Sequence, residues 1–121
     1  MNDNNVTLQQ LKSRMAEFVH ARDWEQFHSP KNISMALAVE ASELMELFQW
    51  ADTQESQEIV RIEREKVEQE LADVLAYTLS FANACDIDLT GAFMRKLALN
   101  AAKYPVEKAK GKSDKYHSYT E

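Results

Sequence analysis

Apolar residues recur three and four positions apart along most of the chain, and this spacing is typical of amphipathic helices. The pattern predicts four helices, at about residues 7–22, 30–50, 53–84 and 90–103. Thr7 and Gln10 have the spacing of a capping box at the start of the first segment. Ser29 followed by Pro30 is typical of an N-cap and a proline in the first turn. We therefore expect helices to begin at both places.

The third predicted segment is unusually long for a chain of this size. About 30 residues in one helix would extend about 45 Å, which exceeds the usual width of a small domain. We expect it either to break, with a loop at the polar residues 53–58, or to have its end covered by a partner subunit. The predicted fold class is all-α, an antiparallel four-helix bundle in a single domain spanning residues 1–121. Residues 105–121 form a polar, lysine-rich tail that we expect to be flexible or to order on binding.

Composition supports the helical interpretation and narrows the class of protein. The 121 residues include only two glycines and two prolines, too few for an all-β sandwich or a glycine-rich nucleotide fold. A single cysteine, Cys85, excludes an internal disulfide framework and a cysteine-based zinc site, and it fits a reducing compartment. We find neither a signal-peptide pattern nor an apolar run long enough for a membrane span, so we expect a cytoplasmic protein without membrane partners.

Charge is distributed unevenly along the chain. Residues 1–102 carry 17 acidic and 9 basic side chains, whereas residues 103–121 carry five lysines and three acidic residues. An acidic body disfavours nucleic acid as a partner, because contacts to phosphates dominate such binding. A lysine-rich tail on an acidic body suits a compact polyphosphate bridged by metal, and it suits plain solubility equally well.

Carboxylates interrupt the apolar stripe of the second predicted helix. At 100° per residue, Glu40 lies between Leu47 and Ile33 inside the apolar arc, and Glu43 lies at the margin of that arc. A carboxylate in such a position is costly unless a cation or hydrogen-bond donors satisfy it. These two glutamates are therefore candidates for a chemical role.

The third predicted helix repeats the arrangement. Glu70 lies at the edge of its apolar arc and Asp73 just beyond. Two residue pairs at i, i+3 on facing helices would supply four carboxylates with no imidazole or thiolate. Such an all-oxygen set favours hard cations, above all Mg²⁺ or Mn²⁺, and Mg²⁺ is often shared with substrate phosphates.

Two other interpretations of these carboxylates remain open. In the first, they are structural partners of arginines across the bundle. In the second, the chain is a di-iron protein, which requires Glu-x-x-His pairs such as Glu17 with His20 and Glu25 with His28. Against the second, Glu17 and His20 fall opposite the apolar face of their helix, and His28 adjoins a helix boundary. His28 either contacts a ligand or caps the second helix.

Four stretches of the sequence resemble the MazG-like all-α nucleoside triphosphate pyrophosphohydrolases, and among them the dCTP pyrophosphatase branch. The matching stretches are RDWEQFHSPKN (22–32), ALAVEASELMELFQW (36–50), EQELADVLAY (68–77) and DL…KLALNAAKYP (88–105). The resemblance implies Mg²⁺-dependent hydrolysis between the α- and β-phosphates of dCTP or related deoxynucleotides, which would clean the nucleotide pool. It also implies a homodimer or homotetramer.

The resemblance further implies roles for individual residues. The Mg²⁺ ligands would be Glu40, Glu43, Glu70 and Asp73. The nucleotide would be bound by Trp24, Trp50, Tyr77, Lys96, Asn100, Lys103, Tyr104 and Lys115. Without the resemblance, tryptophan is more commonly a core or interface residue.

One departure from the family affects base preference. Met15 stands where the dCTP pyrophosphatase branch carries a histidine, and a thioether cannot replace the hydrogen bonds of an imidazole.

A non-catalytic helical module that binds nucleotides or partner helices is the alternative to an enzyme.

Overall fold

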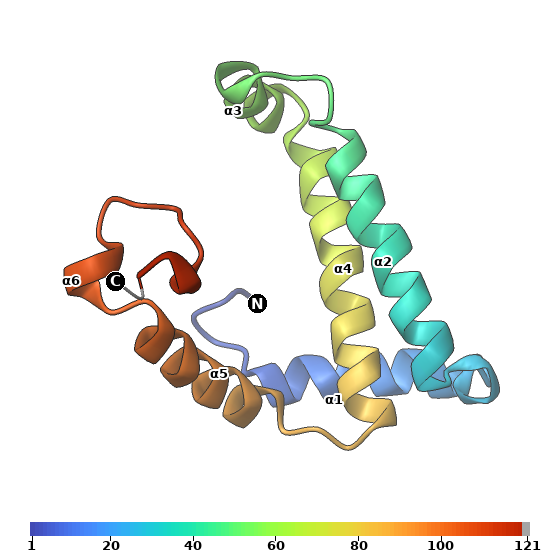
Figure 1. The fold of residues 1–121 in the computed structure, drawn as a ribbon. Helices are drawn as coiled ribbons and strands as arrows, with labels where there is room; N and C mark the ends of the chain where they lie inside the picture. Colours follow the sequence, from blue (N-terminus) through green and yellow to red (C-terminus); the bar gives the residue numbers. More distant parts are fainter. Residues whose placement is uncertain (120–121) are drawn as a thin grey trace. The chain divides into compact units, whose positions relative to one another are not determined.

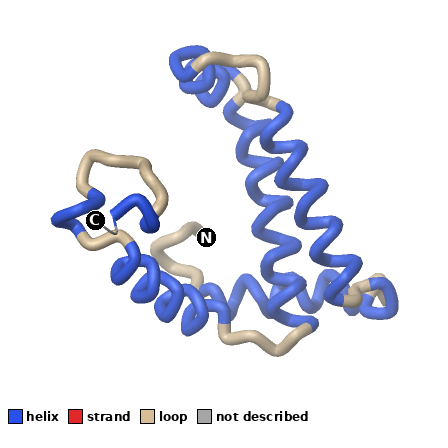
Figure 2. The backbone as a smooth tube through the Cα atoms, in the orientation of Figure 1, coloured by secondary structure: helices blue, strands red, loops and turns tan. Residues whose placement is uncertain are grey.

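Helices are the regular elements of the computed structural model, which describes residues 1–119 (Figures 1 and 2). Within those residues the structure contains no strand, and none of its helices is long and apolar enough to cross a membrane. The chain divides into two units, Met1–Asp86 and Ile87–Glu121. The predicted all-α class is confirmed for the described residues.

Helix α1, Leu8–Ala21, begins at the predicted capping box. The Thr7 hydroxyl accepts a hydrogen bond from the backbone N–H of Gln10 at 3.1 Å. In return, the Gln10 side chain accepts one from the Thr7 N–H at 2.7 Å. Each bond satisfies a backbone donor that the first helical turn would otherwise leave without a partner.

Helix α2, Pro30–Glu46, has Ser29 as its N-cap, with proline in the first turn as predicted. It ends earlier than the expected residue 50. The N–H groups of Leu47 and Phe48 donate three residues back, so the chain tightens into turns before the next helix.

The predicted long third helix is in fact two helices, α3 (Thr53–Ile62) and α4 (Arg64–Ala84). The break is at Glu63, whose φ of −103° and ψ of 35° depart from helical values. The loop predicted for residues 53–58 is wrong, because Asp52 caps this segment at the N–H of Glu55 and makes it helical.

The first unit is built around an antiparallel hairpin of α2 and α4, with α1 crossing one end of it (Figure 1). The short 3₁₀ helix η1, Glu25–Phe27, connects α1 to α2. The buried apolar side chains of the first unit lie at the end of the hairpin that α1 crosses; they are Val19, Ile33, Leu79 and Ala82. The Asn83 amide ties α4 to α1 by donating to the Lys12 carbonyl at 2.9 Å.

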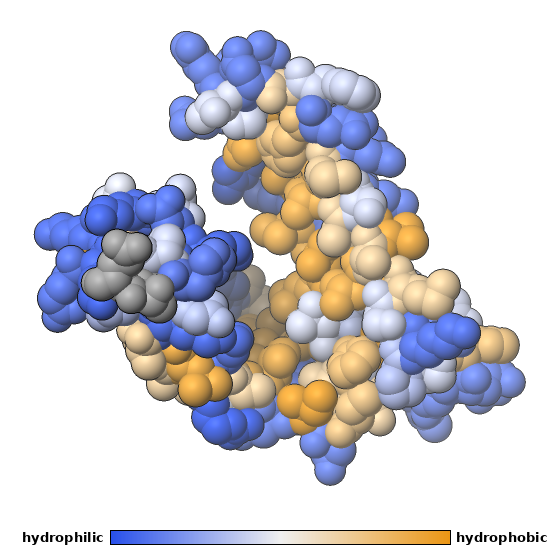
Figure 3. Space-filling view, viewed as in Figure 1, coloured by the Kyte–Doolittle hydropathy of each residue, from blue (hydrophilic) through white to orange (hydrophobic). Residues whose placement is uncertain are grey.

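Large apolar side chains remain exposed along the rest of the hairpin. Met35 and Val39 on α2 are 58% and 55% exposed, and Leu71 on α4 is 56% exposed. Figure 3 shows apolar surface extending over both helices. We call the exposed residues Met35, Val39, Leu71 and Leu75 the open apolar face; Leu75, the least exposed of them at 42%, also lines a cavity against α1.

The second unit contains α5 (Leu89–Lys103), α6 (Val106–Ala109) and the 3₁₀ turn η2 (Tyr116–Tyr119). Asp88 caps α5, which ends before Tyr104 as predicted. The described part of the tail contains two short helical turns, α6 and η2, and its last two residues lie outside the described part. That the tail is flexible or orders on binding stays a prediction. Because α5 belongs to this unit, a four-helix arrangement and a single domain remain predictions.

Candidate metal centre and nucleotide cavity

Three glutamates meet where α2 and α4 lie side by side. Glu40 and Glu43 are one turn apart on α2, and Glu70 faces them from α4. Each offers one carboxylate oxygen, and these oxygens all lie within 4.8 Å of one another. We call these three residues the glutamate cluster.

Two oxygens of the glutamate cluster are buried without a hydrogen-bond partner. They are Oε2 of Glu40 and Oε2 of Glu70. Buried polar atoms are normally paired, so each orphaned oxygen requires an explanation. An oxygen-only set at this separation fits a hard divalent cation, which accepts carboxylate ligands and tolerates crowded negative charge.

The electrostatics of the cluster reflect crowded negative charge. The pKa of Glu40 is raised above its ordinary value by burial first, then by a hydrogen bond shared with Glu43 and by the surrounding carboxylates. The pKa of Glu70 is raised by burial and by the charge of Glu43, while Lys66 acts in the opposite direction. Proton uptake partly relieves the repulsion, and a bound cation would relieve it more fully.

Asp73 lies one turn beyond Glu70 on α4, outside the glutamate cluster. Its side chain is exposed, yet its charge contributes to the raised pKa values of both Glu40 and Glu70. Asp73 also lines a neighbouring cavity, so it stands between the cluster and that cavity.

A cavity of about 370 Å³ lies beside Asp73, between α1, η1 and α4. This volume is within the range of small-molecule sites. Trp24 and Tyr77, both predicted to bind nucleotide, line it together with Asp73. We call it the nucleotide cavity; its lining is Met15, Phe18, Trp24, His28, Asp73, Ala76 and Tyr77.

The end of α1 determines where Trp24 lies. Asp23 adopts a left-handed conformation with φ of 54°, and its N–H donates to the His20 carbonyl. The Trp24 N–H donates to the Val19 carbonyl at 3.1 Å, which completes a Schellman-type C-cap. The Trp24 ring then packs edge-on against Phe18, with centroids 5.8 Å apart.

Two comparisons with known proteins bear on this arrangement. Residues 35–118, which include the whole glutamate cluster, match the MazG-like family. The chain belongs to the MazG-like family. It is 43% identical to mouse dCTP pyrophosphatase 1 and 42% identical to the human protein, each over 112 residues. These alignments cover 91% of this chain and 66% of each relative's length.

A solved structure supports the MazG-like assignment at the level of fold. It is a pyrophosphatase from Archaeoglobus fulgidus, with a TM-score of 0.79 and 33% identity. The match covers 87% of this chain and 98% of the archaeal one. The family resemblance predicted from sequence is thereby confirmed.

The other predicted site residues of this MazG-like chain do not line the nucleotide cavity. Trp50 follows α2 and is 90% exposed, and it does not line the nucleotide cavity. In the second unit, Lys103 lies over the Tyr116 ring at 5.1 Å, and Tyr104 packs edge-on against the same ring. The predicted nucleotide-binding residues within the second unit are Lys96, Asn100, Lys103, Tyr104 and Lys115.

The di-iron interpretation finds no support among the described residues. His20 forms an exposed pair with Glu25 at 2.9 Å, which raises the pKa of the imidazole through that hydrogen bond and charge. The acidic group found within residues 1–119 contains no histidine. The paired glutamates therefore lack the imidazole ligands that a di-iron centre requires.

Sequence reasoning left the role of His28 undecided. The structure shows Ser29 capping α2, and His28 lines the nucleotide cavity instead. No spacing rule could assign it, because His28 lies outside any helix, at a junction that tertiary packing fixes.

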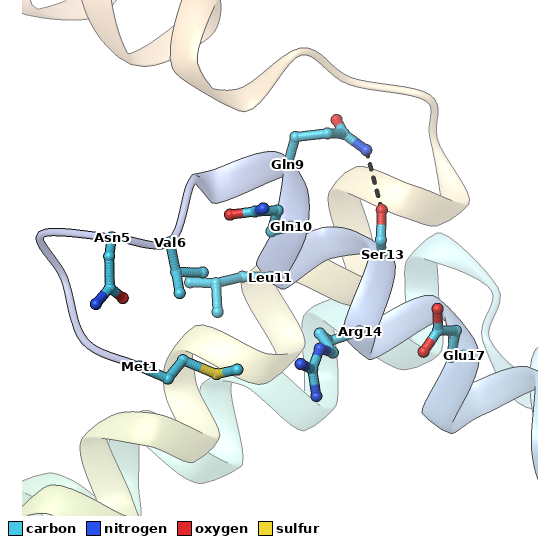
Figure 4. A pocket seen from close by; sticks show the side chains of 9 residues that line it. All are labelled: Met1, Asn5, Val6, Gln9, Gln10, Leu11, Ser13, Arg14 and Glu17. Carbon is cyan, nitrogen blue, oxygen red and sulfur yellow. Dashed lines mark hydrogen bonds between the residues drawn. The ribbon is translucent and has the colours of Figure 1, made fainter.

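A second cavity, of about 460 Å³, lies at the start of α1 and contains none of the predicted site residues (Figure 4). Its amides are already engaged: Gln10 takes part in the capping box, and Gln9 donates to Ser13 at 3.4 Å. We assign it no function.

Proposed function

We propose that this protein hydrolyses deoxynucleoside triphosphates between the α- and β-phosphates, yielding a nucleoside monophosphate and pyrophosphate. The observation that carries the proposal is the glutamate cluster, with two orphaned buried oxygens, next to a cavity lined by Trp24 and Tyr77. The names of the curated relatives support dCTP as a substrate.

Magnesium is the proposed cofactor, with manganese as a substitute. Glu40, Glu43 and Glu70 would hold it, with Asp73 completing the set at the edge of the nucleotide cavity. When bound, the cation supplies charge neutralisation and Lewis-acid activation of the phosphates. The orphaned oxygens of Glu40 and Glu70 support this fit, since they are acceptors without a donor.

The residues of the chain divide the remaining work. In the hydrolytic step, a water oxygen bonds to the α-phosphorus, the bond to the bridging β-phosphate oxygen breaks, and pyrophosphate leaves. Either Glu40 or Glu43 can accept the proton of that water, because both carboxylates belong to the cluster. Trp24 offers the base an aromatic surface, and Tyr77 lies where the sugar would pass.

The family resemblance also gives nucleotide-binding roles to residues of the second unit. Lys96 and Asn100 are one turn apart on α5, so they can reach one ligand together. We propose that they contact phosphate and sugar, and that Lys103, Tyr104 and Lys115 approach the leaving pyrophosphate. Trp50 would contact the nucleotide from outside the nucleotide cavity.

Self-association is part of the proposal. The open apolar face exposes four large side chains that a monomer would leave in water, and a second copy would cover them. We expect a homodimer or a homotetramer by light scattering. A monomer at micromolar concentration would contradict this expectation.

We also propose a cytoplasmic location, which the single free cysteine, Cys85, fits.

The direct test is a panel of ribo- and deoxynucleoside triphosphates with Mg²⁺ or Mn²⁺, with products resolved by ion-exchange chromatography. Monophosphate and pyrophosphate from a deoxynucleotide would establish the reaction and rank the bases. Diphosphate and orthophosphate would contradict the proposed bond cleavage. Binding without turnover would favour a non-catalytic nucleotide module.

A further inference from the structure

Ser80 on α4 is a buried polar residue without a partner. Its side chain is 3% exposed, and its hydroxyl makes no hydrogen bond. A serine within a helix can satisfy itself by donating one turn back, as Thr78 does to the Val74 carbonyl at 2.9 Å. An unpaired buried hydroxyl is destabilising, so its presence at this position needs a reason.

Ser80 lines a cavity of its own, about 370 Å³ in volume, between α1, η1 and α4. Two further polar groups face it with bonding capacity to spare. Asn83 uses its amide N–H₂ on the Lys12 carbonyl, which leaves its amide oxygen as an acceptor. The ring of His28 makes no hydrogen bond within residues 1–119. The lining of this Ser80 cavity is Ala16, Val19, Glu25, His28, Ser80, Asn83 and Ala84.

The Ser80 cavity lies next to the nucleotide cavity, further along α4. Asp73, Tyr77 and Ser80 follow one another at intervals of four and three residues, so they share one face of α4. The rise from Asp73 to Ser80 is about 10 Å along the helix. His28 lines both cavities. A nucleotide with its phosphates at the glutamate cluster and its sugar at Tyr77 would therefore extend its base towards Ser80.

We propose that Ser80 is a specificity-determining residue that reads the edge of the substrate's base, together with Asn83 and His28. This inference rests on the proposed function and deepens it. The Asn83 oxygen is an acceptor, so it matches a base with an exocyclic amino group, as in cytosine or adenine. A carbonyl at that position, as in uracil or thymine, would place two acceptors against each other. Hydrogen-bonded reading of this kind discriminates strongly because a wrong base leaves buried groups unpaired.

The test compares Ser80→Ala with Thr78→Val, which removes a hydroxyl from the same helix outside the Ser80 cavity. For Ser80→Ala we expect kcat/KM for dCTP to fall about tenfold, with a much smaller change for dUTP, so that selectivity collapses. Thr78→Val should keep the wild-type selectivity ratio.

Thermal stability separates this role from a structural one. A structural hydroxyl would lower Tm when removed, whereas removal of an orphaned hydroxyl should leave the Tm of the free protein unchanged or raise it. An unchanged dCTP-to-dUTP ratio in Ser80→Ala would overturn the proposal, whatever happens to Tm.

A binding measurement keeps the inference separable from the proposed reaction. Calorimetry with dCMP and with deoxyribose 5-phosphate, both with Mg²⁺ so that the phosphate does not face the carboxylates alone, measures the contribution of the base. Neither compound has an α–β phosphate bond to hydrolyse. We expect Ser80→Ala to lose about tenfold in affinity for dCMP and nothing for the sugar phosphate. Equal affinities of wild type and variant for dCMP would overturn the inference. An absence of turnover with every triphosphate would instead overturn the proposed function and leave the dCMP result to decide on Ser80.

Discussion

The two ends of the α2–α4 hairpin differ in what their side chains do. Where α1 crosses, Ile33 and Leu79 are buried at 1% and 5% exposure and hold the helices together. Further along the same two helices, Glu40 and Glu70 carry orphaned oxygens and raised pKa values. One pair of helices thus has its most buried apolar contacts at one end, where the Ser80 cavity also lies, and its orphaned carboxylates further along. Changes at one end should leave the property of the other end intact.

The largest expected effect is the loss of activity in Glu40→Gln. The amide keeps the size of the side chain but removes a charged ligand, so activity should fall by more than the roughly 10–100-fold that loss of an outer-shell partner costs. Circular dichroism and Tm should remain at or above wild-type values, because a repelling carboxylate has been removed. Glu46→Gln, an exposed change on the same helix, is the control and should retain activity. Full turnover in Glu40→Gln would show that the carboxylates are not ligands.

The converse change, Ile33→Ala, should reduce stability and spare the chemistry. Removal of a fully buried isoleucine costs about 2–5 kcal/mol of unfolding free energy, measured as a shift of the urea midpoint. Turnover at low temperature should persist. Met35→Ala, two residues away and 58% exposed, should cost at most about 0.5 kcal/mol in the monomer. Any larger loss for Met35→Ala should depend on protein concentration, because it would report self-association.

A smaller effect is expected for Trp24→Ala. Loss of a stacking surface costs about 1–3 kcal/mol per base, so KM should rise about tenfold while kcat changes less. Phe27→Ala is the matched control, since Phe27 is an exposed aromatic residue close to Trp24 that does not line the nucleotide cavity. Equal KM values for the two variants would argue against the cavity as the nucleotide site.

The smallest expected effect is on the pH dependence of stability. The folded pKa values of Glu40 and Glu70 lie above their ordinary value of 4.5, so the folded state binds more protons than the unfolded state between the two values. In EDTA, stability from these groups should therefore fall as pH rises through that window. Mg²⁺ should restore it at neutral pH. Tm profiles of wild type and of a Glu40→Gln/Glu70→Gln variant test this, and identical profiles would contradict it.

Sequence spacing could predict the glutamate cluster, because helical geometry places Glu40 and Glu43 on one face wherever the helix lies. The caps at Thr7 and Ser29 were equally accessible, since they depend on neighbouring residues alone. The break at Glu63 could not be predicted from the sequence, because no glycine or proline lies at that position.

Other features depend on tertiary packing and leave no local signal. An isolated helix would not show that the Ser80 hydroxyl lacks a partner, since that depends on α1 and η1. The spacing of residues on α5 places Lys96 and Asn100 one turn apart, and their proposed contact with a nucleotide does not follow from that spacing.

The Schellman-type cap at Asp23 has a consequence for how this protein can change over evolutionary time. Trp24 reaches the nucleotide cavity because α1 stops at one residue and not the next. One residue inserted into the last turn of α1 would rotate everything beyond it by about 100° and carry the indole away from Tyr77. Insertions and deletions in α1 should therefore be rarer among functional descendants than substitutions. The length of the helix would be inherited together with the aromatic residues Phe18 and Trp24 that line the nucleotide cavity.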